Sequence, residues 1–199
     1  MMASENREAF FARGRPFFSP RTLLDVELAY TLAKFAHRSQ LRKELDDAGH
    51  QVRYFEHVRR VAILTVEELK LINRELVLAA LLHDGIEDTI DITPEMLEHC
   101  FGSEVAMIVK TLSKVPKEGY LERFLMSTDW RAYAIKACDR LDNLTSMSQS
   151  TSEFKLKQVT ETREKYIPLF ERMVDLAPPE ARARCSSLRD RLMRETERQ

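Results

Sequence analysis

The sequence predicts an all-α fold: a single-domain bundle of about eight to ten helices. Apolar residues recur at steps of three and four along most of the 199 residues, as in Leu24, Leu28 and Leu32. This spacing places them on one face of a helix. Only five glycines occur, which leaves few of the tight turns that an array of short strands needs. The length suits one globular domain with its own core.

Helix boundaries follow from apolar spacing and from capping residues. Thr93 followed by Pro94 is typical of a helix start, Gly102 of its end, and Ser103 of the next start. Residues 75–84 are apolar on nearly all sides, which predicts a helix buried at the centre of the domain. Further helices are expected at 22–38, 57–72, 120–127, 129–144, 153–176 and 179–196.

Within the one domain we expect three parts. Residues 1–20 form an N-terminal arm, residues 21–176 form the body, and residues 177–199 form a C-terminal helix that packs on the body or extends it. The arm contains two pairs of adjacent phenylalanines, which we expect to pack on the domain rather than to form a ligand site.

Composition excludes several classes of partner. The 31 basic and 32 acidic residues nearly balance, so neither nucleic acid nor a membrane surface is expected as a partner. The longest apolar run, 76–82, is far shorter than the roughly 20 residues that span a bilayer. The N-terminus does not resemble a secretory signal. Three widely spaced cysteines, Cys100, Cys138 and Cys185, argue against a disulfide framework and favour a cytoplasmic protein.

A cluster of ionisable residues follows the apolar segment: His83, Asp84, Glu87 and Asp88. In a helical frame His83 and Glu87 are four residues apart, as are Asp84 and Asp88, so the four side chains would face one pocket. A buried carboxylate costs several kcal/mol unless a cation or a proton compensates it. A chance His-Asp pair at a helix end is the alternative, but so many acids together predict a bound metal.

Two residues elsewhere can complete the coordination sphere. His57 and Asp139 each lie on a separate expected helix, beside apolar residues that would turn them inward. Two imidazoles and two carboxylates suit Mn²⁺, Fe²⁺ or a similar octahedral ion better than a closed structural zinc, and leave positions open for water and substrate. Glu87 or Asp88 could hold an activated water and move its proton. The set predicts hydrolysis of a phosphate ester or anhydride.

Six segments carry a more specific signal: AHRSQLRK at 36–43, YFEHV at 54–58, AALLHDGIEDT at 79–89, FGSEVAMIVKTLSK at 101–114, IKACDRLDNL at 135–144 and ETREKYIPL at 161–169. In this order they resemble the HD-domain superfamily and, within it, the hydrolase domain of RelA/SpoT alarmone enzymes, including the stand-alone small alarmone hydrolases. The resemblance implies an HD-type helical bundle. It also implies that one Mn²⁺ ion per site supports removal of pyrophosphate from the ribose 3′ position of (p)ppGpp, which returns GDP or GTP.

The resemblance also assigns roles by position. It implies that the metal ligands are His57, His83, Asp84 and Asp139. It implies that the pair that activates water is Glu87 and Asp88. The matched substrate-binding positions are Arg42 and Lys43 against the base, Asn143 at the nucleoside, and Ser146, where the family usually has Thr.

Departures from the family pattern leave alternatives open. Asp142 stands where the family commonly has His, Thr145 where it commonly has Arg, and residues 44–53 form a longer, more polar segment. Loss of two basic groups predicts an altered nucleotide preference, for example toward an adenine alarmone. The alternatives are therefore an HD phosphohydrolase of another nucleotide, such as ppApp or NADPH, and a non-catalytic nucleotide-binding module. No synthetase domain follows residue 199, so we expect a hydrolase acting alone, and self-association into a homo-oligomer is left open.

Overall fold

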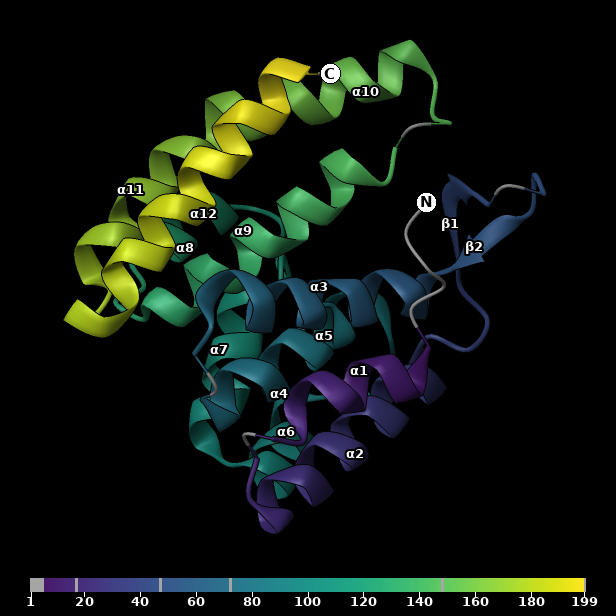
Figure 1. Ribbon diagram of the computed structural model, residues 1–199, viewed down its shortest axis with the longest axis vertical. Helices are drawn as coiled ribbons and strands as arrows, with labels where there is room; N and C mark the ends of the chain where they lie inside the picture. Colours follow the sequence, from purple (N-terminus) through teal and green to yellow (C-terminus); the bar gives the residue numbers. More distant parts are fainter. Residues whose placement is uncertain (1–5, 17, 47, 72, 148, 199) are drawn as a thin grey trace.

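A computed structural model describes residues 6–16, 18–46, 48–71, 73–147 and 149–198, which form a helical bundle with one small hairpin (Figure 1). Its elements are α1 (Arg7–Gly14), α2 (Pro20–Ala36), β1 (Leu41–Leu45), β2 (Gln51–Arg53), α3 (Tyr54–Leu69), α4 (Arg74–Leu82), α5 (Gly85–Asp88), α6 (Pro94–Phe101), α7 (Ser103–Leu112), α8 (Tyr120–Leu125), α9 (Trp130–Thr145), α10 (Ser152–Glu161), a π-helical turn (Thr162–Tyr166), α11 (Ile167–Leu176) and α12 (Pro179–Arg198). The predicted all-α class is confirmed.

Helix α4 lies at the centre of the bundle, as its all-round apolar character predicts. Every residue from Leu76 to Leu82 is at most 1% exposed. The helix packs against α2, α3 and α7 (Figure 1). A helix without a polar face must be enclosed by other elements. The residues that follow Leu82 therefore emerge inside the protein, and this positions the candidate site.

The expected caps of α6 are present. The Thr93 hydroxyl accepts a hydrogen bond from the backbone N–H of Met96 at 3.2 Å, and Pro94 occupies the first turn. At the other end Gly102 has a φ of 98°, a conformation that glycine adopts without steric cost. The next helix, α7, starts directly after this glycine. Local capping chemistry thus sets both boundaries.

The segment 153–176 is helical throughout, as its apolar spacing predicts, but its middle forms a π-helical turn. It forms α10, the π-helical turn and α11. Pro168 lies in the first turn of α11. Since proline has no backbone N–H and its ring crowds the preceding turn, the regular α-helical hydrogen-bond pattern is interrupted there. Wider π-type spacing just before the proline accommodates this break.

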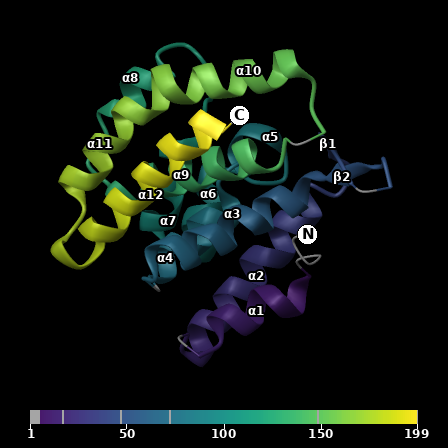
Figure 2. The same ribbon diagram turned by 45° about the horizontal axis from the view of Figure 1, so that its top comes forward.

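The polar segment 44–53 contains most of a hairpin that the sequence analysis did not predict. Strands β1 and β2 pair antiparallel, with Leu41 opposite Arg53. Burial alternates along β1, so that Arg42 and Glu44 face the body of the protein. The hairpin projects beside the start of α3, as both views show (Figure 1, Figure 2). The inward face of this hairpin contributes charged groups to the candidate site.

The N-terminal arm contains a helix, α1, that packs on the body. Phe10 and Phe11 are 5% and 7% exposed, and their ring centres lie 5.3 and 5.5 Å from that of Tyr30. Phe18 is partly buried against the same core, whereas Phe17 lies outside the described residues. Burial of the first aromatic pair agrees with the packing expected of this arm.

The C-terminal helix α12 packs against α3, α9 and α11. Its end is tied to the π-helical turn, where Arg163 donates a hydrogen bond to the Thr196 carbonyl at 2.8 Å. Helix α12 is long, but Arg and Glu side chains make it strongly polar. In the described part of the chain, no helix combines the length and the apolar character needed to cross a membrane.

Candidate active site

Four predicted metal ligands converge in the interior. His57 lies on α3, His83 and Asp84 lie between α4 and α5, and Asp139 lies on α9. The His57 Nε2 atom is 3.6 Å from Asp84 Oδ2 and 3.4 Å from Asp139 Oδ1, and His83 Nε2 is 3.0 Å from Asp84 Oδ2. One ligand atom from each of His57, His83 and Asp139 lies within 4.8 Å of the others. All four side chains are buried.

His83 presents a buried nitrogen to this cluster. Its Nδ1 atom lies 2.8 Å from the carbonyl oxygen of Ala80. A carbonyl can only accept, so Nδ1 carries a proton, and in the neutral imidazole Nε2 then carries the lone pair. Within the described residues Nε2 is buried and makes no well-aligned hydrogen bond, although Asp84 Oδ2 lies 3.0 Å away. Buried polar atoms are nearly always satisfied, and a cation bound between this lone pair and the carboxylates would satisfy it. The residues therefore fit a divalent metal ion.

The imidazole of His57 is oriented by a hydrogen bond to Asp142. Its Nδ1 donates to Asp142 Oδ2 at 2.7 Å, so that Nε2 faces Asp84 and Asp139. Burial, the largest influence, lowers the pKa of His57, and the charge of Arg42 acts in the same direction. Hydrogen bonds to the surrounding carboxylates outweigh both and raise the pKa of His57 to about 10. These acids thus favour a positive charge at the centre of the cluster, either a proton or a metal ion.

Asp139 is held by two neighbours on its own helix. Lys136 Nζ donates to Oδ2 at 2.8 Å and Asn143 Nδ2 donates to Oδ1 at 2.7 Å. These partners lie three and four residues away, the spacings that share a helix face. Burial raises the pKa of Asp139, but the charge of Lys136 and the contact with His57 hold that pKa well below its ordinary value. Asp139 is therefore ionised and fixed in place.

The segment 83–88 is not one continuous helix, which differs from the helical frame that the sequence analysis assumed. Helix α4 ends at Leu82 and α5 begins at Gly85. A Cβ atom at position 85 would lie 2.7 Å from Ile92 Cδ1, so glycine allows α5 to pack closely there. Despite the break, Asp84 and Asp88 meet again at Tyr54, whose hydroxyl is 2.8 Å from an oxygen of each.

The two residues expected to handle water face different partners. Lys114 holds Glu87, with 3.0 Å between Nζ and Oε1 and a backbone N–H donated to Oε2 at 3.2 Å. Asp88 accepts from Tyr54. Burial and then the charge of Asp84 raise the pKa of Asp88 above its ordinary value. The two carboxylates thus differ in environment, Glu87 beside a cation and Asp88 beside an acid.

All four predicted substrate-binding residues line one pocket of about 280 Å³: Arg42, Lys43, Asn143 and Ser146. Arg42 donates to Asn143 Oδ1 at 2.6 Å, and Lys43 Nζ lies 5.7 Å from the centre of the Phe154 ring. Tyr54 also lines the pocket and reaches Asp84 through its hydroxyl. The pocket therefore lies directly beside the metal-ligating cluster.

Sequence reasoning did not single out Tyr54 or Phe154. Tyr54 precedes His57 by three residues, so a helix places both on one face, and this spacing was an available signal. Phe154, near the start of α10, approaches Lys43 of β1 across the pocket, a contact between distant segments that no local pattern reveals. Asp142 and Thr145, where the sequence departs from the family pattern, do not line the pocket. The pocket thus gives no support to the expected effect of these two positions on nucleotide preference.

A second hollow, of about 320 Å³, adjoins the cluster and is lined by lysines and glutamates. Lys114, Lys117 and Lys165 contribute to its wall together with Tyr120. The Tyr120 hydroxyl is buried and meets no hydrogen-bond partner in the described ranges. Since Lys114 also binds Glu87, this hollow and the cluster share a wall. Glu122 and Glu161 also line the hollow, and Lys165 Nζ lies 3.6 Å from Glu161 Oε1, so the lining is of mixed charge with one more lysine than glutamate.

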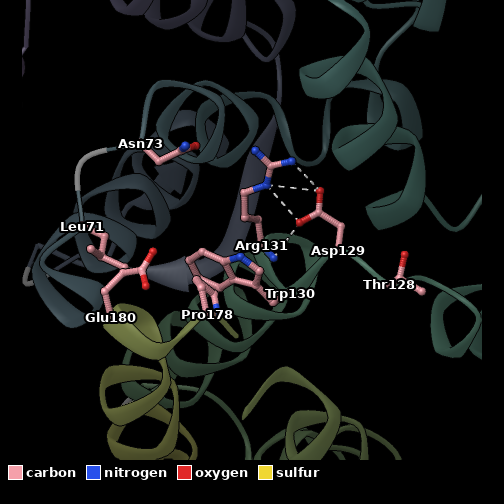
Figure 3. A pocket seen from close by; sticks show the side chains of 8 residues that line it. All are labelled: Leu71, Asn73, Thr128, Asp129, Trp130, Arg131, Pro178 and Glu180. Carbon is pink, nitrogen blue, oxygen red and sulfur yellow. Dashed lines mark hydrogen bonds and ion pairs between the residues drawn. The ribbon is translucent and has the colours of Figure 1, made fainter. Parts of the chain in front are cut away.

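A larger hollow of about 600 Å³ lies elsewhere (Figure 3). It is lined by Leu71, Asn73, Thr128, Asp129, Trp130, Arg131, Pro178 and Glu180. In Figure 3 the Arg131 guanidinium faces the Asp129 carboxylate, with 2.8 Å between Nη2 and Oδ2. This larger hollow lies at the N-terminal ends of α4 and α9, whereas the metal-ligating cluster follows the C-terminal end of α4. It contains none of the candidate metal ligands, so size does not identify the active site.

Comparison with known proteins identifies relatives of this chain. Residues 29–123 match the family model described as the HD domain. The 3′-pyrophosphohydrolase of guanosine-3′,5′-bis(diphosphate) from Aquifex aeolicus is 34% identical over 163 residues, which are 77% of this chain and 22% of that protein. The bifunctional (p)ppGpp synthase/hydrolase SpoT of Escherichia coli is 34% identical over 157 residues, 73% of this chain and 21% of that protein. The chain spans about a fifth of the length of the curated relatives it matches.

One solved structure resembles nearly the whole chain. It is described as a metazoan ortholog of SpoT that hydrolyzes ppGpp. The similarity covers 90% of this chain and 97% of that one, with a TM-score of 0.61 and 25% sequence identity. Residues 29–123 therefore form an HD domain, a type of domain that implies divalent metal binding, and the resemblance of the chain to RelA/SpoT-type HD-domain hydrolases is confirmed.

Proposed function

We propose that this protein is a metal-dependent 3′-pyrophosphohydrolase that converts (p)ppGpp to GDP or GTP and pyrophosphate. The observation that carries the proposal is the buried Nε2 of His83, which makes no well-aligned hydrogen bond and faces His57 and the acids beside a pocket lined by four nucleotide-binding candidates. Relatives from Aquifex and Escherichia coli bear names that state this activity, and the metazoan neighbour is described as hydrolyzing ppGpp.

We propose one Mn²⁺ ion as the cofactor, held by His57, His83, Asp84 and Asp139. Two imidazole nitrogens and carboxylate oxygens form a mixed donor set that suits Mn²⁺ or a similar ion of higher coordination number. When bound, such an ion polarises a phosphoryl oxygen and lowers the pKa of water. In the protein itself, the contacts of Lys136 and Asn143 keep Asp139 ionised and fixed for this role.

The nucleoside would occupy the pocket beside β1. The guanidinium of Arg42 and the ammonium of Lys43 lie on its wall and can contact the face of a base. Asn143 and Ser146 supply amide and hydroxyl groups that can bond a ribose or base edge. Tyr54 lines this pocket and its hydroxyl contacts Asp84. A nucleoside bound in the pocket would therefore have its ribose 3′ substituent near the proposed metal ligands.

The phosphate groups would lie toward the lysine-lined hollow. Lys117 can contact phosphate oxygens there, as can Lys114 and Lys165, which pair with Glu87 and Glu161 in the protein alone. The Tyr120 hydroxyl offers an unpaired buried donor. Cations placed where phosphate charge develops stabilise the transition state of phosphoryl transfer more than the ground state. The nucleoside pocket reaches Asp84 through Tyr54, and this hollow reaches Glu87 through Lys114, so a scissile 3′ phosphate ester would lie near the proposed metal ligands.

Glu87 and Asp88 would orient the attacking water and accept its proton. Lys114 fixes the carboxylate of Glu87, and Tyr54 fixes that of Asp88. The raised pKa of Asp88 brings this group closer to the working pH than an ordinary aspartate, which favours proton exchange. In the balanced reaction, water adds to the phosphorus and the ribose 3′ oxygen leaves with a proton, so pyrophosphate is released.

Product analysis tests the proposal. The protein would be incubated with ppGpp in Mn²⁺ and in a chelator, and GDP, pyrophosphate and inorganic phosphate would be quantified. We expect equimolar GDP and pyrophosphate in Mn²⁺ and neither in the chelator. Parallel reactions with ppApp and NADPH measure preference among nucleotides. Absence of pyrophosphate from ppGpp with every divalent metal tried would refute the proposal.

A further inference from the structure

Asp142 lies directly behind the metal ligand His57. It is 2% exposed, and its Oδ2 accepts the Nδ1 proton of His57 at 2.7 Å. Asp139, one turn earlier on α9, faces the opposite nitrogen of the same ring at 3.4 Å. Two aspartates of α9 therefore contact the imidazole, Asp142 at Nδ1 and Asp139 at Nε2. When a metal ion takes the place of the second ring proton, the contact with Asp142 keeps the remaining proton on Nδ1 and leaves the Nε2 lone pair toward the metal position.

Arg60 compensates the buried charge of Asp142. Its Nε donates to Oδ1 at 2.6 Å and its Nη2 donates to Oδ2 at 3.1 Å, a two-pronged contact. Arg60 lies on α3, three residues after His57, so both reach α9 from the same helix face. A buried carboxylate with a guanidinium and an imidazole as partners avoids the cost of an unpaired buried charge.

The hairpin continues this chain of charges. Glu44, on the inward face of β1, accepts from Arg60 Nη2 at 2.7 Å. Its same oxygen lies 3.6 Å from Arg42 Nε. Arg42 in turn donates to Asn143, which donates to the metal ligand Asp139. The polar contacts thus run from one proposed ligand to another through the hairpin, in the order His57, Asp142, Arg60, Glu44, Arg42, Asn143 and Asp139.

We propose that Asp142 is a positioning residue that aims His57 at the metal, and that the β1–β2 hairpin, through Glu44 and Arg60, holds Asp142 in place. The inference rests on the proposed function only in that a metal ion binds His57. Partners of this kind, one step removed from the metal, typically contribute 10- to 100-fold to metal affinity. The hairpin is then part of the metal centre and not only one wall of the nucleotide pocket.

Metal affinity of the whole chain tests the role of Asp142 without reference to hydrolysis. Mn²⁺ binding to the metal-free protein would be measured by titration calorimetry for wild type, Asp142→Asn and Glu104→Gln. The last variant removes the Glu104 carboxylate, which lies 2.9 Å from Arg131. Arg131 is near the start of α9, eight residues before the proposed ligand Asp139. We expect Asp142→Asn to bind Mn²⁺ about 10- to 100-fold more weakly and Glu104→Gln to bind as wild type does.

A spectroscopic signature separates positioning from general stability. Co²⁺ absorption in the visible range reports the arrangement of ligands around the ion. We expect an altered Co²⁺ spectrum in Asp142→Asn and an unchanged one in Glu104→Gln, with both variants folded by circular dichroism. If Asp142→Asn is folded and retains wild-type Mn²⁺ affinity and Co²⁺ spectrum, the inference is overturned. Failure of the wild-type protein to bind Mn²⁺ would also overturn it.

The hairpin contact provides an independent variant should Asp142→Asn not fold. Glu44→Gln leaves Asp142 and Arg60 intact and changes a partly exposed strand residue. We expect a smaller loss of Mn²⁺ affinity, about 3- to 10-fold, because the variant weakens only the contact of Glu44 with Arg60, which is two residues removed from His57 in the series of polar contacts. Wild-type affinity in Glu44→Gln would overturn the role of the hairpin. A protein that binds Mn²⁺ and shows both losses, yet releases no pyrophosphate from ppGpp, would contradict the proposed function and leave this inference standing.

Discussion

The hydroxyl of Tyr54 lies 2.8 Å from Oδ2 of Asp88. The same hydroxyl is equally close to Asp84, so it bridges a proposed metal ligand and a proposed water-handling residue. Burial, followed by the charges of these two aspartates, raises the pKa of Tyr54 far above its ordinary value. The phenol therefore stays protonated and acts as a donor at every working pH.

Tyr54→Phe removes this donor and keeps the ring. We expect kcat for pyrophosphate release to fall about 10- to 100-fold, because hydrogen bonds to charged groups contribute about 1.5–3 kcal/mol. Tyr30→Phe is the matched control, since its hydroxyl accepts from Arg59 at 3.3 Å in the core beneath α1. Steady-state kinetics on ppGpp with saturating Mn²⁺ would measure both. Equal kcat in the two variants would contradict a role for the Tyr54 bridge.

Glu87→Gln tests the handling of water. Glu87 is held by Lys114 and is not among the proposed metal ligands. We expect kcat to fall about 100- to 10,000-fold, the usual contribution of general acid–base groups, while Mn²⁺ affinity stays at the wild-type value. Single-turnover kinetics together with calorimetry would measure the two quantities. Normal turnover would remove Glu87 from the mechanism, and a parallel loss of Mn²⁺ affinity would make it a metal ligand instead.

The central helix predicts a large difference between two leucine truncations. Leu81 on α4 is 0% exposed, whereas Leu24 on α2 is 66% exposed. Leu81→Ala should lower the free energy of unfolding by about 2–5 kcal/mol, because it removes buried methyl groups and leaves a cavity. Leu24→Ala should change it by less than about 0.5 kcal/mol. Urea denaturation followed by circular dichroism compares them, and equal costs would contradict the central position of α4.

The buried thiols make stability depend on alkaline pH. Burial raises the pKa of Cys138 to about 12 and that of Cys185 to about 11, whereas unfolded thiols titrate near 9. The folded state therefore keeps protons that the unfolded state loses as pH rises. This stabilisation is fully present below about pH 9 and is lost progressively as pH rises through the folded-state pKa values.

Unfolding midpoints between pH 8 and pH 12 measure this effect. We expect the decline of stability above pH 9 to be smaller in Cys138→Ala than in wild type. At pH 8 a thiol reagent should modify the exposed Cys100 in the folded protein and reach Cys138 and Cys185 only after unfolding. Rapid labelling of Cys138 under native conditions would show that the core around α9 opens readily.

Features with a local cause could be predicted from the sequence. The all-round apolar character of 76–82 predicted the central helix, and Thr93 and Gly102 predicted both ends of α6. The spacing of ionisable residues around His83 predicted a cluster, and the structure brings His57, Asp84 and Asp139 to it. Each inference used chemistry within one or two helical turns. The roles of these residues in binding metal stay predictions.

Features that depend on distant pairing could not be predicted in this way. The hairpin is short and polar, and it becomes recognisable only where Glu44 meets Arg60 of α3. The contact of Asp142 with His57 joins residues 85 positions apart and depends on the packing of α9 against α3. The π-helical turn within 153–176 has a local cause in Pro168, which the apolar spacing alone does not reveal.

Anomalous diffraction from crystals grown with Mn²⁺ tests the central claim most directly. The claim is that the lone pairs of His57 and His83 and the carboxylates of Asp84 and Asp139 hold one divalent ion beside the nucleotide pocket. A single Mn²⁺ peak within bonding distance of both Nε2 atoms, lost in His83→Ala crystals, is the predicted result. A folded protein with no peak at this cluster, or with Mn²⁺ bound only elsewhere, would contradict it.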